Sequence, residues 1–306
     1  MIEEIFTASV FASTLRLATP YIFAAVGETF SQKSGVLNLG LEGVMLMGAF
    51  AAFYTVYATG SVIIGLLAAL IVGALMGLAT AFISVTLQAE QGISGIGIYL
   101  FGLGMSELLF VRLIGTPVSI DGFPRLYIPG FSDIPVIGEI FFNHNLLVYA
   151  AFLLVPIAAF ILNRTTFGLM IRAVGQNPEA ADAMGVNVAR VRYMTVIIAG
   201  TLAGLAGASL SIALLNVFQQ NLTSGLGFIA VALVYFGRWT PLGVLLGSLL
   251  FSFVNALQLQ IGSIGVNIPS EFAVMAPYVI TIIALVFASK RAEKPTALTK
   301  PFRRGD

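Results

Sequence analysis

Long apolar stretches follow one another along almost the whole chain, with short polar, glycine-containing or proline-containing breaks between them. A helix needs roughly 20 apolar residues to cross hydrocarbon about 30 Å thick, and most of the stretches reach that length. Because 58% of the 306 residues are hydrophobic and only 9% are charged, one soluble core cannot bury them. The sequence therefore predicts an all-α polytopic membrane protein with about eight to ten transmembrane helices. Nine stretches are recognised, at 5–30, 36–57, 61–87, 92–111, 145–163, 193–217, 221–237, 240–260 and 271–289.

Two of these stretches allow more than one interpretation. The first contains Arg16 and Pro20, so it is either one span or an interfacial helix followed by a span. The stretch at 221–237 is short, so it is either a span or a re-entrant segment. A change in either interpretation would move the N-terminus to the other side of the membrane.

The distribution of lysine and arginine predicts the orientation, because these residues are retained on the cytoplasmic side next to membrane spans. With nine crossings, 12 of the 15 basic residues fall on one side, and only Arg112 and Arg125 fall on the other. We therefore expect a cytoplasmic C-terminus and an external N-terminus. The predicted inner residues are Lys33, Arg164, Arg172, Arg190, Arg192, Arg238, Lys290, Arg291, Lys294, Lys300, Arg303 and Arg304.

Polar segments divide the chain into one large domain and a tail. Residues 112–144 form the longest external connection, and four prolines exclude a continuous helix there, so we expect a folded-back loop. Residues 1–290 are predicted to form a single transmembrane domain. Residues 291–306 are polar, basic and proline-containing, and are predicted to be a disordered cytoplasmic tail.

Signals for a short, capped helix lie in the connection between the fifth and sixth stretches, in the sequence NPEAADAMG. Asn177 is a natural N-cap, and Pro178 suits the first helical position. Glu179 favours the positive end of the helix dipole, and Gly185 suits the left-handed position after a helix end. The predicted helix, 178–184, is roughly 10 Å long, too short to cross a membrane. It is also too short to be stable alone in water.

Two interpretations of the cytoplasmic loop 164–192 stay open on these residues. The loop could be a simple connection with one helical turn. Alternatively, the helix is a rigid peg for a cytoplasmic partner, with Ala180, Ala181 and Met184 as its apolar face and flanking arginines available for carboxylates. The candidate contact residues are Asn177, Pro178, Glu179, Ala180, Ala181, Asp182, Met184 and Gly185.

Small residues recur four positions apart in several stretches, as in the pairs Gly73 with Gly77 and Gly200 with Gly204. This spacing lets helix backbones approach closely in lipid, where the hydrophobic effect does not drive helices together. We favour packing within the chain, with a subunit interface as the alternative.

Polar residues inside apolar stretches are candidates for a solute pathway, because they are costly in lipid. Asn38 and Glu42 are four apart and are predicted to share a helical face, with nearby glycines interrupting the helix as in many transporters. They either line a pore or fix the packing of neighbouring helices. Glu28 and Gln32 are interpreted in the same way.

Two further groups are candidates for contact with solute. Asn216, Phe218 and Gln219 combine amides with an aromatic ring, which suits a nucleobase and ribose, although a polar turn between spans is the alternative. Asn255 and Gln258 share a face at i, i+3 and either line the path or bridge helices. Arg238 and Trp239 are interpreted as an anchor at the membrane boundary.

Three separated segments resemble one known family. The sequence GLMIRAVGQNPEAADAMGVNVARVRYMTVIIAGTLAGLAGA at 168–208 resembles the coupling loop and following span of the ABC permease superfamily, which includes ribose and branched-chain amino-acid importers. ETFSQKSGVLNLGLEGVMLMGAF at 28–50 and GLGFIAVALVYFGRWTPLGVLLGSLLF at 225–251 resemble the branch that takes up nucleosides with a basic-membrane-lipoprotein receptor.

The resemblance implies an ABC importer permease fold and a non-catalytic transport subunit in the plasma membrane of a prokaryote. The partners that it implies are a cytoplasmic ABC ATPase that binds ATP and Mg, a second and often different permease subunit, an extracytoplasmic solute-binding lipoprotein and membrane lipid. No cofactor and no nucleic acid are expected on this chain. It also implies that 178–184 is the coupling helix.

The residues themselves agree that the motor is another polypeptide, because no GxxxxGK[ST] phosphate-binding loop is present. A sugar or branched-chain amino-acid ABC permease is the alternative function. An ion-coupled secondary transporter is a further alternative, disfavoured by weak internal repetition. An intramembrane enzyme is disfavoured by one histidine and no cysteine, so no catalytic or metal-binding residues are predicted.

Overall fold

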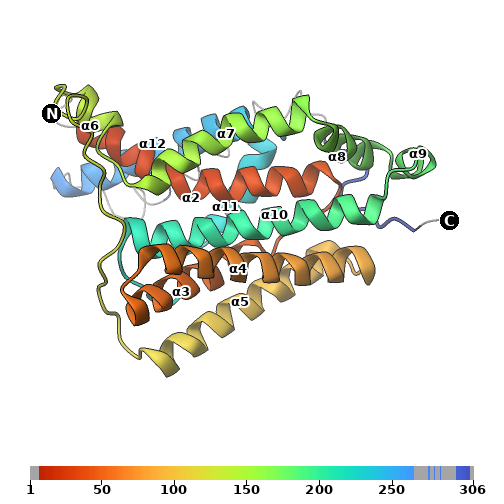
Figure 1. Cartoon of the computed structure of the whole chain (residues 1–306), viewed down its shortest axis with the longest axis horizontal. Coiled ribbons are helices and arrows are strands. Elements are labelled where there is room, and N and C mark those ends of the chain that lie inside the picture. The colour runs from red at the N-terminus through yellow and green to blue at the C-terminus, as the bar shows by residue number, and fades with distance from the viewer. Residues whose placement is uncertain (1–6, 265–274, 276–278, 280–282, 284–293, 304–306) are drawn as a thin grey trace.

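The computed structural model describes residues 7–264, 275, 279, 283 and 294–303, and Figure 1 shows their arrangement. Seven helices in this part of the chain are long and apolar enough to cross a membrane, which confirms the predicted all-α polytopic fold. They are α2 (Ala8–Lys33), α3 (Leu41–Thr59), α4 (Val62–Ala81) continued by the π-helical turn η1 (Phe82–Thr86), α5 (Gln91–Leu113), α7 (Leu146–Arg164), α10 (Val188–Ser209) continued by η2 (Leu210–Leu214), and α12 (Pro241–Ile264).

The remaining predicted stretches have different outcomes. The stretch at 221–237 contains the helix α11 (Leu226–Phe236), whose 11 residues extend about 16 Å and cannot cross hydrocarbon alone. The stretch at 271–289 lies almost entirely outside the described residues. The first stretch is one continuous helix through Pro20, so the alternative of a separate interfacial helix is wrong from residue 8 onward.

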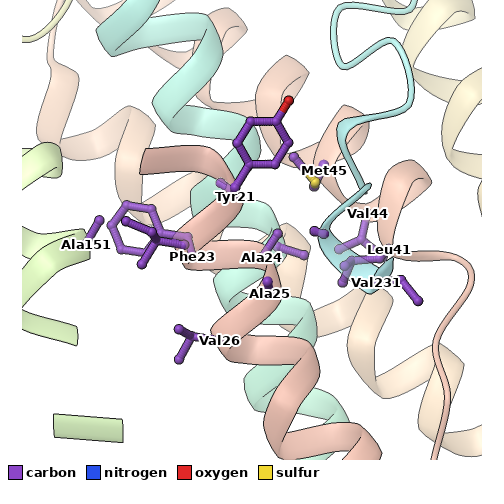
Figure 2. Packing of buried hydrophobic residues seen from close by; sticks show 14 of the residues in the cluster. Tyr21, Phe23, Ala24, Ala25, Val26, Leu41, Val44, Met45, Ala151 and Val231 are labelled. Atoms are coloured by element: carbon purple, nitrogen blue, oxygen red, sulfur yellow. The ribbon is translucent and has the colours of Figure 1, made fainter. Parts of the chain in front are cut away.

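Helix α2 occupies the centre of the bundle. Every residue from Ala18 to Gln32 is buried, because α7, α10, α11 and α12 all pack around this helix. Figure 2 shows Phe23 pointing toward Ala151 of α7, with Ala24 on the side of α2 that faces Val44 of α3. The second half of α2 therefore contacts protein on all its faces, and α2 is less apolar than the more exposed helices α4 and α7.

Glycines hold α4 against α10. A methyl group added at Gly73 would overlap the carbonyl oxygen of Gly200, and one added at Gly200 would overlap the carbonyl oxygen of Gly73. Gly77 and Gly204 lie in the same contact. The prediction that these small residues serve packing within the chain is confirmed at these positions.

The external connection predicted at 112–144 folds back over one end of the bundle, which also carries the first described residues (Figure 1). The short helix α6 (Ile137–Phe141) lies within it. Backbone N–H groups of Ile120 and Phe123 donate to the carbonyl oxygens of Asn216 and Ile212, at 3.0 and 2.8 Å. These bonds confirm the folded-back conformation and tie the loop to the segment that follows η2.

The predicted loop 164–192 is more helical than its sequence indicated. It contains α8 (Thr166–Gln176), which the sequence analysis does not predict, and the predicted helix α9 (Pro178–Ala183). Thr165 and Asn187 cap α8 and α10 by accepting backbone N–H bonds, so α10 begins at Val188 rather than at residue 193. The helices α8 and α10 therefore both begin just after a polar N-cap side chain, which is a helix-start signal that can be read from the local sequence.

The C-terminal tail, predicted to be disordered, differs from the structure over 294–303. These residues lie at the end of the bundle that carries α8 and α9 (Figure 1). Ala297 and Leu298 are 3% and 8% exposed, and the backbone of Ala297 donates to the carbonyl oxygen of Gly175 at 2.9 Å. The polar, proline-containing composition of the tail predicts disorder, because composition carries no information on which carbonyl groups the folded bundle leaves unpaired at nearby helix ends.

Candidate functional site

Two crossings of the bundle contain a segment of non-helical backbone next to their helix. In the first crossing, residues 34–40 precede α3, and in the second, residues 215–225 precede the short helix α11. Together, the second segment and α11 run from the folded-back loop at one end of the bundle to Trp239, which bonds Gln32 in the last turns of α2. Such discontinuous helices place backbone groups in the interior of transporters.

A single carboxylate joins the two interruptions. Glu42, in the first turn of α3, accepts hydrogen bonds from the hydroxyl of Thr223 at 2.6 Å and from the backbone N–H groups of Gly225 and Gly227 at 2.6 and 2.5 Å. Glu42 is 1% exposed and Thr223 is fully buried. We call these four residues the Glu42 junction.

The Glu42 junction is favourable because the carboxylate lies at the N-termini of α3 and α11, where helix dipoles stabilise negative charge. Gly227 permits the approach, since a Cβ atom there would lie 2.5 Å from the Cα atom of Glu42. The geometry thus supports the packing alternative, in which Glu42 fixes two neighbouring segments against each other. No described contact bears on a pore-lining role.

Asn38 does not share a helical face with Glu42, so that prediction is wrong. Asn38 belongs to the non-helical segment, where its side-chain oxygen accepts a bond from Gly40 N–H at 2.9 Å. Its own N–H donates to Glu28 Oε1 at 3.0 Å. The flanking glycines unwind the chain before α3 begins, which confirms the predicted interruption and removes the i, i+4 relationship.

A second polar cluster extends from Asn38 to the turn after α11. Gln32 donates its amide N–H to Glu28 Oε1 at 2.9 Å, and the indole of Trp239 donates to Gln32 Oε1 at 2.8 Å. Trp239 is 3% exposed, so the prediction of a membrane-boundary anchor is wrong for this side chain. Glu28 Oε2 and Asn38 Nδ2 are buried and have no hydrogen-bond partner among the described residues.

The aromatic candidate Phe218 lies in a closed cluster. Its ring is fully buried, with centroids 5.4 Å from Phe50, 6.1 Å from Phe53 and 5.4 Å from Phe110. Its predicted companions Asn216 and Gln219 do not join it, because Asn216 contacts the folded-back loop through its backbone and Gln219 is exposed. The structure therefore places the ring in the core, away from any open surface.

The remaining candidates lie elsewhere, and α5 carries one further carboxylate in an apolar stretch. Asn255 and Gln258 are half-buried on α12, and no described contact joins them to the Glu42 junction. Glu107 lies on the exposed face of α5, sixteen positions after Gln91. A charge at the centre of a lipid-facing span costs about 2.5–3.5 kcal/mol on insertion scales, and the cost is smaller for Glu107 because it lies nearer to the C-terminal end of α5. The signal that singled out Glu42, a carboxylate in an apolar stretch, would also have found Glu107.

The helix α9 confirms the predicted capping in detail. Asn177 Oδ1 accepts the N–H of Ala180 at 2.9 Å, and Gly185 has a φ of +85°. The N–H of Val186 bonds the carbonyl oxygen of Ala181 at 3.0 Å, which closes the helix as a Schellman motif together with the Gly185 to Asp182 bond of 2.8 Å. The helix ends at Ala183, with Met184 as its C-cap.

The exposed face of α9 differs in one residue from the prediction. Pro178 and Ala181 are buried, so Ala181 packs inward, whereas Ala180 is exposed and Met184 is 85% exposed. Leu169 of α8 is 58% exposed beside them. A groove of about 450 Å³ between α8 and α9 is lined by Leu169, Met170, Ala173, Gln176, Asn177, Ala180, Ala181, Met184 and Val186.

Comparison with known proteins gives relatives that match almost the whole chain. The guanosine ABC transporter permease protein NupQ of Bacillus subtilis is 40% identical over 96% of each chain. The putative glucose ABC transporter permease protein TsgC13 of Haloferax volcanii is 37% identical over 98% of each chain, and the nucleoside ABC transporter permease protein NupC of Lactococcus lactis is 36% identical over 94% of each.

The family comparison covers most of the chain. No solved structure matches it. A family model described as the permease component of a branched-chain amino acid transport system matches residues 10–285, which include both interrupted crossings and the capped helix α9. The chain is thus a member of this family of ABC transporter permeases.

Proposed function

We propose that this chain is the membrane-spanning subunit of an ABC importer for nucleosides, and that a separate ATPase binds ATP and Mg²⁺ and docks on α9. The observation that carries the proposal is the exposed, doubly capped helix α9 at one end of a bundle of this family. The chain has no phosphate-binding loop of its own, which supports a motor on another polypeptide.

The orientation follows from the same end of the molecule. Helices α8 and α9 and residues 294–303 lie together at one end of the bundle, opposite α6 (Figure 1). Most of the basic residues belong to these segments and to the neighbouring helix ends, which favours the cytoplasm for this end. The folded-back loop and the N-terminus then face outward, where an extracytoplasmic solute-binding lipoprotein would dock.

The exposed face of α9 suits a protein partner. Met184 and Leu169 present apolar side chains on both sides of the groove, and an exposed apolar groove with a polar rim is typical of an interaction site. Because α9 buries only Pro178 and Ala181, it can fit a cleft of the ATPase without unpacking the bundle.

A second permease subunit fits the exposed face of α5. Glu107 is exposed there, and lipid is an unfavourable neighbour for its carboxylate. A pair of permease subunits with the solute path between them would give Glu107 polar surroundings. In that pair the Glu42 junction would hold the interrupted crossing 215–236 in position beside the path.

The substrate assignment rests on the names of relatives. Two of the three relatives described above are named for guanosine or nucleosides, which favours a nucleoside. A sugar is the second candidate, because a relative of similar identity is named as a putative glucose permease. The half-buried amides Asn255 and Gln258 suit the hydroxyl groups of either substrate.

Docking on α9 is tested with Met184→Arg in the complete complex. This side chain is 85% exposed, so the variant is expected to fold normally and to lose co-purification of the ATPase together with ATP-driven uptake. Met184→Leu keeps an apolar side chain at the same exposed position, so it serves as the matched control and is expected to retain both. Full ATPase retention by the Met184→Arg complex would contradict the assignment of α9.

Substrate class is tested by competition in proteoliposomes that contain the complex and its receptor. Uptake of labelled guanosine is expected to be reduced by unlabelled nucleosides and unaffected by glucose or leucine. Competition by glucose alone would transfer the assignment to sugars, and competition by leucine alone would transfer it to branched-chain amino acids.

A further inference from the structure

Residues 294–303 run across the end of the bundle next to α9 and bond four separate parts of it. The first contact is with α8. The N–H of Ala297 donates to the carbonyl oxygen of Gly175, in the last turn of α8, at 2.9 Å. The hydroxyl of Thr296 donates to Gln176 Oε1 at 2.8 Å. Carbonyl groups in the last turn of a helix lack partners within the helix, so the tail supplies one of the missing donors.

The second contact is with the end of α2. The N–H of Thr299 donates to the carbonyl oxygen of Gly35 at 3.0 Å, just after α2 ends. Gly35 has a φ of +96°, and a Cβ atom there would lie 3.0 Å from the carbonyl oxygen of Ala297. The tail therefore lies directly on the backbone that leads from α2 into the interrupted crossing.

Arg192 of α10 fastens this contact. The residue is 1% exposed, and its guanidinium donates to the carbonyl oxygen of Ser34 at 3.2 Å and to that of Lys300 at 3.0 Å. A cation at the C-terminus of a helix is stabilised by the helix dipole, and α2 ends at this position. One buried side chain thus connects α10, the end of α2 and the tail.

A further contact is with the turn between η1 and α5. Gln88, in the turn between η1 and α5, donates to the carbonyl oxygen of Phe302 at 2.9 Å and accepts from Arg303 at 2.5 Å. The tail is therefore bonded near both of its described ends. It also borders α9, because a groove of about 240 Å³ is lined on one side by Gln176, Asn177, Pro178 and Glu179 and on the other by Thr296, Ala297, Lys300 and Pro301.

We propose that residues 294–303 are a strap that fixes α8 and α9 against the ends of α2 and α10. The helix α9 has six residues and buries only two of them, so its orientation depends on its base. The strap supplies that base and links it to α2, which leads into the interrupted crossings. A displacement of α9 by the ATPase would then reach the bundle interior through the strap; this consequence rests on the proposed docking function.

The strap is tested first without the ATPase, by amide hydrogen exchange on the chain in lipid nanodiscs. A chain ending after residue 293 is compared with one ending after Arg303, which keeps every described bond of the strap. Removal of the strap is expected to speed exchange in 178–187 by about tenfold, as expected for a local opening unit, while α4 and α7 are unchanged. Equal exchange in the two chains would overturn the proposal.

A second measurement covers the case in which the shortened chain does not reach the membrane. The chain has no cysteine, so Gln176→Cys combined with Thr296→Cys gives a unique pair at a described contact. A short bis-maleimide is expected to crosslink this pair in membranes, with exchange in 178–187 no faster than in the parent chain. Labelling of both cysteines without a crosslink would refute the strap.

Coupling is then measured in the complete complex. The shortened chain is expected to keep the ATPase bound but to transport at least about fivefold less solute per ATP hydrolysed, because α9 moves without the bundle. Unchanged coupling beside altered exchange would restrict the strap to a structural role and contradict the proposed transmission. Failure of Met184→Arg to release the ATPase would instead refute docking on α9, so the two proposals fail separately.

Discussion

The helices α9 and α11 are both too short to be stable alone, and they are capped in opposite ways. Asn177 caps α9 through an N–H group three residues further along the chain. Glu42 caps α11 through groups about 180 positions away, at Gly225 and Gly227. The cap of α9 is local and exposed, whereas that of α11 is distant and fully buried. A local cap sets one helix, while a distant cap also sets the position of one crossing relative to another.

The largest expected effect comes from Glu42→Ala. Three donors of the Glu42 junction would lose their acceptor, and each buried unsatisfied donor costs about 1–3 kcal/mol, so we expect a loss of roughly 3 kcal/mol or more in unfolding free energy. Thermal unfolding of the purified chain in detergent measures it. Glu42→Gln keeps one acceptor oxygen, so its unfolding free energy should lie between those of the parent chain and Glu42→Ala.

Glu90 provides the matched control for this substitution. It also accepts backbone N–H bonds at a helix start, from Gly92 and Ile93, but it is exposed and local. Glu90→Ala is therefore expected to shift the unfolding midpoint much less than Glu42→Ala. Equal shifts would show that the distance and burial of the cap do not matter, and the comparison of the two helices would break down.

A smaller loss is expected for Gly227→Ala. The added Cβ atom would lie 2.5 Å from the Cα atom of Glu42, and overpacking of this kind costs about 1–3 kcal/mol. Gly97→Ala on the exposed face of α5 is the control, since no atom lies within 4 Å of its added Cβ and alanine favours a helix. The same thermal unfolding assay should show a lower midpoint for the first variant and an unchanged or higher one for the second.

The two caps also explain what the sequence could predict. Asn177, Pro178 and Gly185 are read within nine positions, so the boundaries of α9 were predicted to within a residue. The spans were predictable because each apolar stretch carries its own signal. Neither the Glu42 junction nor the contacts of Arg192 follow from local patterns, because their partners are more than 100 positions away. A carboxylate in a span indicated that something would bond it, but not which segment.

The smallest expected effect on stability is that of Asn177→Ala, and it tests whether a local cap has a local consequence. Loss of an N-cap costs about 1 kcal/mol, and here the cost should appear as faster amide exchange within 178–184 rather than as a lower global midpoint. Asn177→Asp keeps an acceptor oxygen and should restore the parent exchange rate. A global midpoint that falls as far as in Glu42→Ala would mean that α9 is coupled to the whole bundle. In that event the strap would transmit the loss of the local cap to the bundle, and removal of residues 294–303 should make Asn177→Ala purely local.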